Sequence, residues 1–173
     1  MRRRLLTLTA ISGLALLSTP ATLRGQSSAS WLQWGGPTRN FVSDSKGLAS
    51  TWPAGGPKKL WSRTLGEGHS SIAVENGRLY TIYRQINRSA QGTNHEEVVA
   101  AFEAATGKTI WEFKYPASTA GIDFTQGLGP HSTPLIVGNR IYTTSSRSEL
   151  FALDKATGKR SWSHDMTAEY RAS

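Results

Sequence analysis

Cysteine is absent from the 173-residue chain, which excludes disulfide bonds, thiolate metal sites and a cysteine nucleophile. Charged residues are scarce, at 18%, whereas glycine is abundant, with 17 copies. Helical bundles favour alanine, glutamate, lysine and leucine, so this composition favours a β protein rich in turns. No apolar run reaches the roughly 20 residues that a membrane-spanning helix needs.

Acidic residues are in the minority, and the formal net charge is +8. Arg2, Arg3, Arg4 and Arg24 precede the expected mature start without any acidic residue, which leaves 16 basic and 12 acidic residues, a net charge of +4. These charges are spread along the chain and form no basic stripe interleaved with aromatic residues. The charge pattern therefore argues against nucleic acid as a partner.

The first 25 residues have the order of a secretory signal peptide. A basic start from Arg2 to Arg4 precedes an apolar stretch from Leu5 to Leu17, and polar residues follow. We expect cleavage after Gly25, with cleavage after Ala21 or retention as a short membrane anchor as alternatives. The paired arginines leave twin-arginine export open beside the general route. The mature protein is expected in the periplasm or outside the cell, with no membrane span after signal removal.

The mature chain contains an internal repeat. Residues 101–111 align without a gap on residues 152–162, and both stretches contain Ala-Thr-Gly-Lys followed by Trp. A second pair aligns residues 69–74 with residues 131–136, at an offset of 62. Repeats with periods of 20 to about 50 residues are typical of solenoids and propellers.

Each repeat is expected to form four strands with short turns. In the second repeat the strands are expected over residues 133–137, 140–145, 149–154 and 160–165. Asn76-Gly77 and Gly138-Asn139 are two-residue turns, since both residue types tolerate positive φ. The first repeat carries 11 extra residues within Arg84 to Glu96, and their polar composition predicts a surface loop.

The expected fold class is all-β: a partial β-propeller with four-stranded antiparallel blades. Residues 58–173 are expected to hold two full blades, over 69–114 and 131–165, and one closing strand over 58–63. Residues 26–57 are expected to form a largely irregular lead-in segment. A closed ring needs about four to eight blades. The chain is therefore expected to be a fragment of a longer ring, with the rest absent, or one of several assembling copies.

The repeated motif, Ala-x-acidic-x-x-Thr-Gly-x-x-x-Trp, resembles the tryptophan-docking motif of pyrroloquinoline-quinone (PQQ) repeat β-propellers, a family of secreted bacterial proteins. Residues 31–40 and 52–61 also resemble the start of such proteins. In that family the Trp of one blade packs on the turn glycine of a neighbouring blade. The resemblance implies five structural docking residues: Trp61, Trp111, Trp162, Gly107 and Gly158.

Two pairs of polar residues occupy equivalent positions before the first strand of each repeat: His69 with His131, and Ser70 with Ser132. That strand is expected to line the central channel, so the four side chains are candidates for a ligand pocket. Hydrogen bonding at a blade corner is the alternative. The four histidines of the chain have neither helical i, i+4 spacing nor a zinc pattern, so no metal site or catalytic residue is assigned.

The loop from Pro116 to Pro130 is expected to cover one face, with Asp123 and Gln126 in it. Binding residues gather on such loops. Two acidic sites, Glu96-Glu97 and Asp154, are expected to flank strands in water.

Two classes of function remain. The first is an exported, non-enzymatic scaffold or binding module, whose partners would be missing blades, other copies of the chain or a periplasmic protein. The second, implied by the resemblance, is part of a quinoprotein dehydrogenase that oxidises alcohols or sugars with PQQ and calcium. The lack of cysteine, and of positions matching a catalytic Asp or calcium ligands, favours the first class. An inactive, unfolded remnant is a third possibility.

Overall fold

The computed structural model describes residues 30–89, 92–123 and 125–171. The signal peptide expected over residues 1–25 lies outside the described residues. In the part of the chain that is described, no helix has the length and apolar character needed to cross a membrane.

The first sheet is antiparallel and has the strand order β1-β2-β3-β4. Its strands are β1 (Ala73–Glu75), β2 (Arg78–Ser89), β3 (Gly92–Glu103) and β4 (Thr109–Pro116). Asn76 and Gly77 join β1 to β2 with φ values of 49° and 72°, as the two-residue hairpin turn requires.

The second sheet has the same plan, with the order β5-β6-β7-β8. Its strands are β5 (Leu135–Val137), β6 (Arg140–Thr144), β7 (Glu149–Asp154) and β8 (Arg160–Asp165). These bounds lie within two residues of those expected from the repeat. Two four-stranded antiparallel sheets confirm the expected fold class of a partial propeller.

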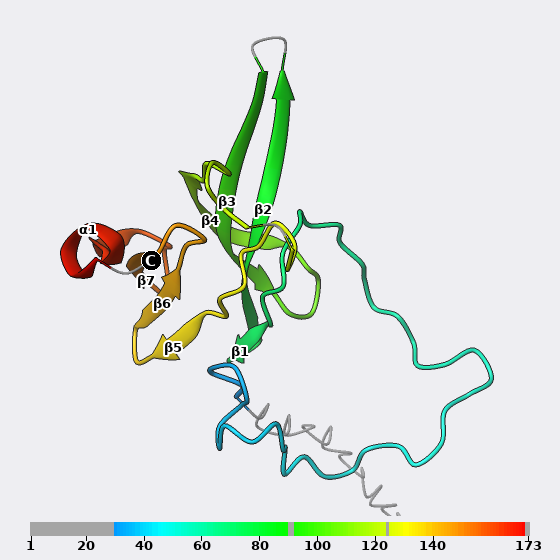
Figure 1. Cartoon of the computed structure of the whole chain (residues 1–173). Coiled ribbons are helices and arrows are strands. Elements are labelled where there is room, and N and C mark those ends of the chain that lie inside the picture. The colour runs from blue at the N-terminus through cyan, green and yellow to red at the C-terminus, as the bar shows by residue number, and fades with distance from the viewer. Residues whose placement is uncertain (1–29, 90–91, 124, 172–173) are drawn as a thin grey trace, which may run out of the picture.

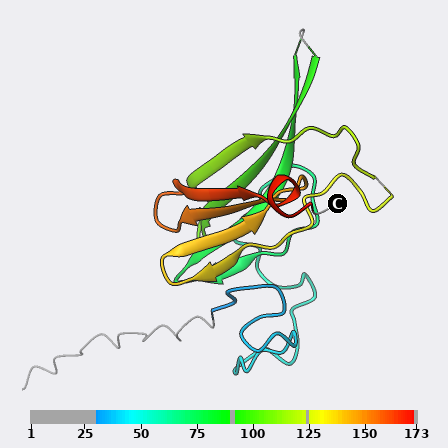
Figure 2. The same ribbon diagram turned by 60° about the vertical axis from the view of Figure 1, so that its left-hand side comes forward.

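The two sheets pack side by side, as neighbouring blades do (Figures 1 and 2). One buried apolar cluster joins them, and its members from the first sheet include Tyr80, Ile82 and Trp111. Phe151 and Leu153 are among its members from the second. Along β4 the buried positions alternate with more exposed ones, which is the period-two pattern of a strand packed on one face.

The 11 extra residues of the first repeat do not form the loop that was expected. They lengthen β2 and β3 to 12 residues each, against 5 in β6 and 6 in β7. Pairing continues from Arg78↔Glu103 to Ser89↔Gly92, and Figure 1 shows the hairpin projecting beyond the rest of the sheet. The polar sequence suits this hairpin, since Asn87, Arg88 and Asn94 in its outer part are exposed.

The closing strand expected over residues 58–63 is also not observed. The backbone there is irregular, and the nearest pairing is an isolated bridge between Glu67 and Arg84. A strand requires a neighbouring strand for its backbone hydrogen bonds. Among the described residues, no strand pairs with residues 58–63.

A short helix that was not anticipated, α1 (Met166–Tyr170), follows β8. Asp165 caps it, because its side chain accepts a hydrogen bond from the backbone N–H of Ala168.

Candidate functional site

Trp61 makes a specific contact with the last turn of the first sheet. Its indole N–H donates to the carbonyl oxygen of Ala104 at 2.8 Å. Its ring lies so close to Gly107 that a Cβ built on that glycine would be 2.6 Å from it. The contact does not depend on residues 58–63 forming a strand.

Trp111 makes the equivalent contact with the next repeat. Its indole N–H donates to the carbonyl oxygen of Lys155 at 3.1 Å, and a Cβ on Gly158 would be 2.5 Å from its ring. Trp162 differs, because it is 40% exposed and packs beside Tyr142 of its own sheet. That these tryptophans hold the blades together stays a prediction.

One end of both sheets carries the connection between the sheets. It carries the β2–β3 hairpin, the loop over residues 117–130 between the sheets, and the β6–β7 turn over residues 145–148. Figure 2 shows the loop extending from this end. We call these three segments, together with residues 67–71 and 131–133, the loop face.

His69 and His131 meet at the loop face. Their rings are stacked, with centroids 4.9 Å apart and planes inclined by 2°. The His69 ring lies against Gly127 and the His131 ring against Gly129, where an added Cβ would approach them to 2.6 and 3.1 Å. The backbone N–H of His69 donates to Pro130 at 2.9 Å. Both side chains are exposed, so the predicted pair does come together in an accessible position.

Ser70 and Ser132 bond to their own blades. Ser70 Oγ donates to the carbonyl oxygen of Ser71 at 2.8 Å, and Ser132 Oγ donates to that of Thr144 at 2.5 Å. The N–H of Ser71 reaches across the repeats to Thr133 Oγ1 at 3.1 Å. These are hydrogen bonds of a blade corner, and a ligand role for the four predicted residues stays a prediction.

A buried guanidinium, missed by the sequence reasoning, lies at the centre of the loop face. The Arg84 side chain is fully buried. Its Nη2 donates to Glu97 Oε1 at 2.9 Å and to Ser146 Oγ at 2.8 Å. Its Nη1 donates to the carbonyl oxygen of Ala117 at 2.8 Å, and its Nε to that of Leu128 at 3.1 Å. One side chain therefore joins the hairpin, both ends of the inter-blade loop and the second sheet.

Glu97 is fully buried as well, although the sequence predicted it to lie in water. Tyr115 donates its hydroxyl to Glu97 Oε2 at 2.8 Å, and the backbone N–H of Ser146 donates to the same carboxylate. Burial, and then the negative charge of Glu97, raise the pKa of Tyr115. Because the charges are paired and hydrogen-bonded, the desolvation cost of the ion pair is offset.

Arg84 of the ion pair is hydrogen-bonded to the inter-blade loop beside the histidines. Leu128, whose carbonyl accepts from Arg84, lies between the two glycines that contact the imidazole rings. Arg84 and Glu97 also face each other in the β2–β3 register. Opposite charges at paired positions of a hairpin were the available sequence signal, but it became visible only once the extra residues were assigned to strands.

The other acidic candidates take no part in the Arg84–Glu97 network. Asp123 is exposed and accepts hydrogen bonds from Thr125, which lower its pKa. Gln126 is exposed in the same loop. Asp154 accepts from Thr157 in a turn at the opposite end of the sheet, and these bonds lower its pKa. Among the described residues no group of three or more His, Cys, Asp or Glu side chains could hold a metal ion.

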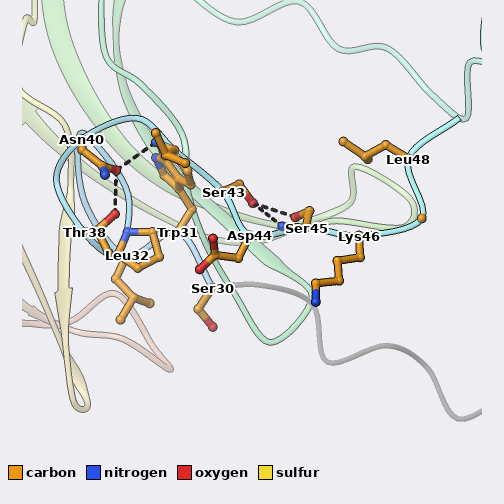
Figure 3. Close-up of a pocket in the computed structure, with 13 residues that line it drawn as sticks. Ser30, Trp31, Leu32, Thr38, Asn40, Ser43, Asp44, Ser45, Lys46 and Leu48 are labelled. Atoms are coloured by element: carbon orange, nitrogen blue, oxygen red, sulfur yellow. Dashed lines mark hydrogen bonds between the residues drawn. The ribbon is translucent and has the colours of Figure 1, made fainter. Parts of the chain in front are cut away.

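Two hollows lie elsewhere. One of about 960 Å³ is lined only by residues 30–48 of the lead-in segment (Figure 3). The other, of about 380 Å³, lies between residues 63–66 and the first sheet. There Tyr83 donates to Glu112 Oε1 at 3.2 Å, and burial raises the pKa of Tyr83 to about 12. Neither hollow is lined by His69 or His131.

Comparison with known proteins found one matching family model, described as outer membrane protein assembly factor BamB, over residues 50–173. Among solved structures, a europium-containing methanol dehydrogenase is 22% identical, with a TM-score of 0.35, over 54% of this chain and 14% of that chain. BamB from Moraxella catarrhalis is 18% identical, with a TM-score of 0.29, over 54% of this chain and 31% of that chain. The chain thus corresponds to less than a third of either protein. The search of curated proteins found no match.

Proposed function

Because the chain belongs to the family of the outer membrane protein assembly factor BamB, we propose that it is an exported, non-enzymatic propeller protein that acts as a scaffold or binding module in outer-membrane protein assembly. The basic and apolar N-terminus supports export to the periplasm. The assignment to outer-membrane protein assembly comes from the description of the family.

The observation that carries the binding role is the buried Arg84–Glu97 pair beneath the loop face. Binding loops are effective when a rigid scaffold positions them. A guanidinium that donates to both ends of the inter-blade loop limits its freedom, and so reduces the entropy lost when a partner binds. The loop face therefore has the rigidity expected of a protein-binding surface.

In-cell crosslinking tests this role. A photoreactive amino acid at Gln126, which is exposed in the inter-blade loop, should crosslink to a protein of the outer-membrane assembly machinery. The matched control is Asn139, which is also exposed but lies in the β5–β6 turn at the opposite end of the second sheet. Equal crosslinking from both positions, or none from Gln126, would contradict the proposal.

A cofactor assay separates this role from that of a quinoprotein dehydrogenase. The purified chain is mixed with PQQ and Ca²⁺, and both PQQ binding and dye-linked alcohol oxidation are measured. We expect neither stoichiometric binding nor turnover. Binding of one PQQ per chain would favour the dehydrogenase alternative.

Export is tested by fusion to alkaline phosphatase, which is active only outside the cytoplasm. Residues 1–30 ahead of the reporter should give activity, whereas a fusion that begins at Gln26 should not. Equal activity of the two fusions would contradict export by this segment.

A further inference from the structure

The lead-in segment crosses the outermost edge of β1 and that of β5, the edges that face away from β2 and β6. We call these two edges the inner edges, because the first strand of a blade is expected to line the central channel. Trp31 forms an antiparallel bridge with Val74 of β1, with N–H to oxygen distances of 2.8 and 2.7 Å. The next residue, Leu32, accepts a hydrogen bond from the N–H of Ile136 in β5 at 2.8 Å. Both views show the blue segment passing beside β1 and β5 (Figures 1 and 2).

The two residues that receive this segment are equivalent in the repeat. Val74 and Ile136 are 62 residues apart, the offset of the repeat, and each is the central residue of a three-residue strand. β1 and β5 are also the first strands in their sheets, so one edge of each has no partner within its own sheet. The repeat therefore presents the same free backbone groups twice, and one extended dipeptide bonds to both.

The side chains of the dipeptide have different roles. Leu32 packs against the buried cluster shared by the two sheets. The Trp31 ring stays within its own segment, where it lies over Gly36 at a distance that leaves no room for a Cβ. The sheet edges thus bind the backbone of Trp31 and Leu32, and of the two side chains only that of Leu32 packs against the buried cluster.

We propose that the inner edges of β1 and β5 form a binding site for an extended peptide of a partner protein, with an aliphatic side chain at the position of Leu32. Residues 31–32 are the internal occupant of this site. Addition of a strand to an exposed sheet edge is a general mode of peptide recognition, in which main-chain bonds supply affinity and side-chain pockets supply specificity. The peptide site is formed by the two blades alone, and this proposal does not depend on the proposed role in outer-membrane protein assembly.

The internal occupant is held in a way that permits exchange. Residues 33–60 contain no strand or helix, and their hydrogen bonds to described residues all lie within that stretch. Six large apolar side chains in it are exposed: Trp34, Phe41, Val42, Leu48, Trp52 and Leu60. A segment tethered in this manner competes with a free peptide at an effective concentration of about millimolar.

The experiment measures binding of a fluorescent peptide with the sequence of residues 30–37 to the full chain and two variants. Leu32→Asp weakens the internal occupant, and Leu48→Asp is the matched control, because Leu48 is 78% exposed in the same segment. We expect Leu32→Asp to bind the peptide at least about tenfold more tightly than the unaltered chain, since its competitor is weakened. Leu48→Asp should bind as the unaltered chain does, and a peptide with Asp at the Leu32 position should not bind.

Amide hydrogen exchange gives a second readout on the same samples. The N–H groups of Val74 and Ile136 should exchange faster in Leu32→Asp and be protected again by the peptide. If circular dichroism shows that Leu32→Asp is unfolded, Leu32→Ala replaces it, with the same order of affinities expected.

Three outcomes would overturn the proposal. The first is no saturable binding to any protein, and the second is equal affinity of Leu32→Asp and the unaltered chain. The third is a concentration-dependent dimer of the unaltered chain that Leu32→Asp abolishes, because the edges would then serve a second copy of the chain.

Discussion

Single glycines decide how closely successive repeats approach. Gly107 and Gly158 have φ values of 72° and 71°, a region that favours glycine, and each lies beneath an indole ring. A Cβ at either glycine would therefore have two separate effects: it would strain the backbone at positive φ, and it would collide with the indole ring.

Gly158→Ala and Gly77→Ala separate these two demands. Gly77 has nearly the same φ as Gly158, 72° against 71°, but a Cβ there would meet nothing within 4 Å. We expect Gly77→Ala to lower the free energy of unfolding by about 1 kcal/mol through backbone strain. Gly158→Ala should lower it by about 3 kcal/mol, because overpacking against Trp111 adds to the strain. Urea unfolding measures both values, and equal losses would show that the ring contact contributes nothing.

Removing one partner of the buried Arg84–Glu97 ion pair should lower the free energy of unfolding strongly. Arg84→Met leaves the Glu97 carboxylate buried without its partner, and we expect a loss of about 3–5 kcal/mol in the free energy of unfolding. Lys114→Met is the control, since its pair with Glu112 is partly exposed and worth about 0–1 kcal/mol. Replacing Arg84 and Glu97 together by methionine should cost less than the sum of the single changes. Additive losses would contradict coupling of the pair.

Tyr115 should make the protein lose stability at alkaline pH. Its pKa is raised in the folded state, while in the unfolded chain it titrates near 10. The contribution of Tyr115 to the free energy of unfolding is fully present below about pH 10. It declines as pH rises further, because Tyr115 then loses its proton in the unfolded chain but keeps it in the folded protein. The slope contributed by one tyrosine is at most about 1.4 kcal/mol per pH unit. Urea unfolding between pH 8 and 11 should show a shallower decline for Tyr115→Phe, and an unchanged slope would contradict this assignment.

Among the elements, the outer β2–β3 hairpin differs in origin from the β3–β4 and β7–β8 ladders. The ladders of both blades shift register at equivalent points, between Ala101 and Phe102 and between Ala152 and Leu153. That irregularity is part of the repeat. The outer hairpin exists only in the first repeat. In the described ladders, residues 92–95 of β3 pair with β2 and not with β4, although His95 also accepts a hydrogen bond from the N–H of Ala117.

Shortening the hairpin should therefore spare the blade. Residues 87–94 are replaced by Asn-Gly, a pair suited to a two-residue turn between Ile86 and His95. We expect the free energy of unfolding to change by less than about 1 kcal/mol, because Arg84 and Glu97 stay paired below the cut. Thermal unfolding by circular dichroism tests this, and a loss of several kcal/mol would show that the outer hairpin supports the sheet.

For the whole molecule, the two blades are joined by a shared apolar cluster and by polar contacts, among them the network of Arg84. Trp111 belongs to the cluster and reaches the turn of the second sheet. Arg84 belongs to the network and reaches Ser146 of the same sheet. The blades are thus connected near both ends of their strands.

Trp111→Ala and Trp162→Ala compare a tryptophan that contacts the next blade with one that packs on its own blade. Both residues end the same motif, but Trp111 is 8% exposed and Trp162 40%. We expect Trp111→Ala to cost about 3–5 kcal/mol as a large buried side chain and Trp162→Ala about 1 kcal/mol. Similar losses in urea unfolding would mean that the contact with Gly158 does not join the blades.

The repeat, the strands and turns of the second blade, and the equivalent positions of His69 and His131 could be predicted from the sequence alone. These features follow from local patterns, because strand alternation and turn residues act over a few positions and the repeat copies them at a fixed offset. The same patterns predicted a strand over residues 58–63 from Trp61, which the structure does not contain.

Which polar residues are buried, and where the lead-in segment lies, could not be predicted in this way and depend on tertiary contacts. Glu97 has a polar neighbour on its N-terminal side and was expected in water, yet contacts from Arg84, Tyr115 and Ser146 surround it. Trp31 and Leu32 reach β1 and β5 across more than 40 residues of chain. Burial and edge pairing depend on segments that are distant in sequence, and no local period encodes them.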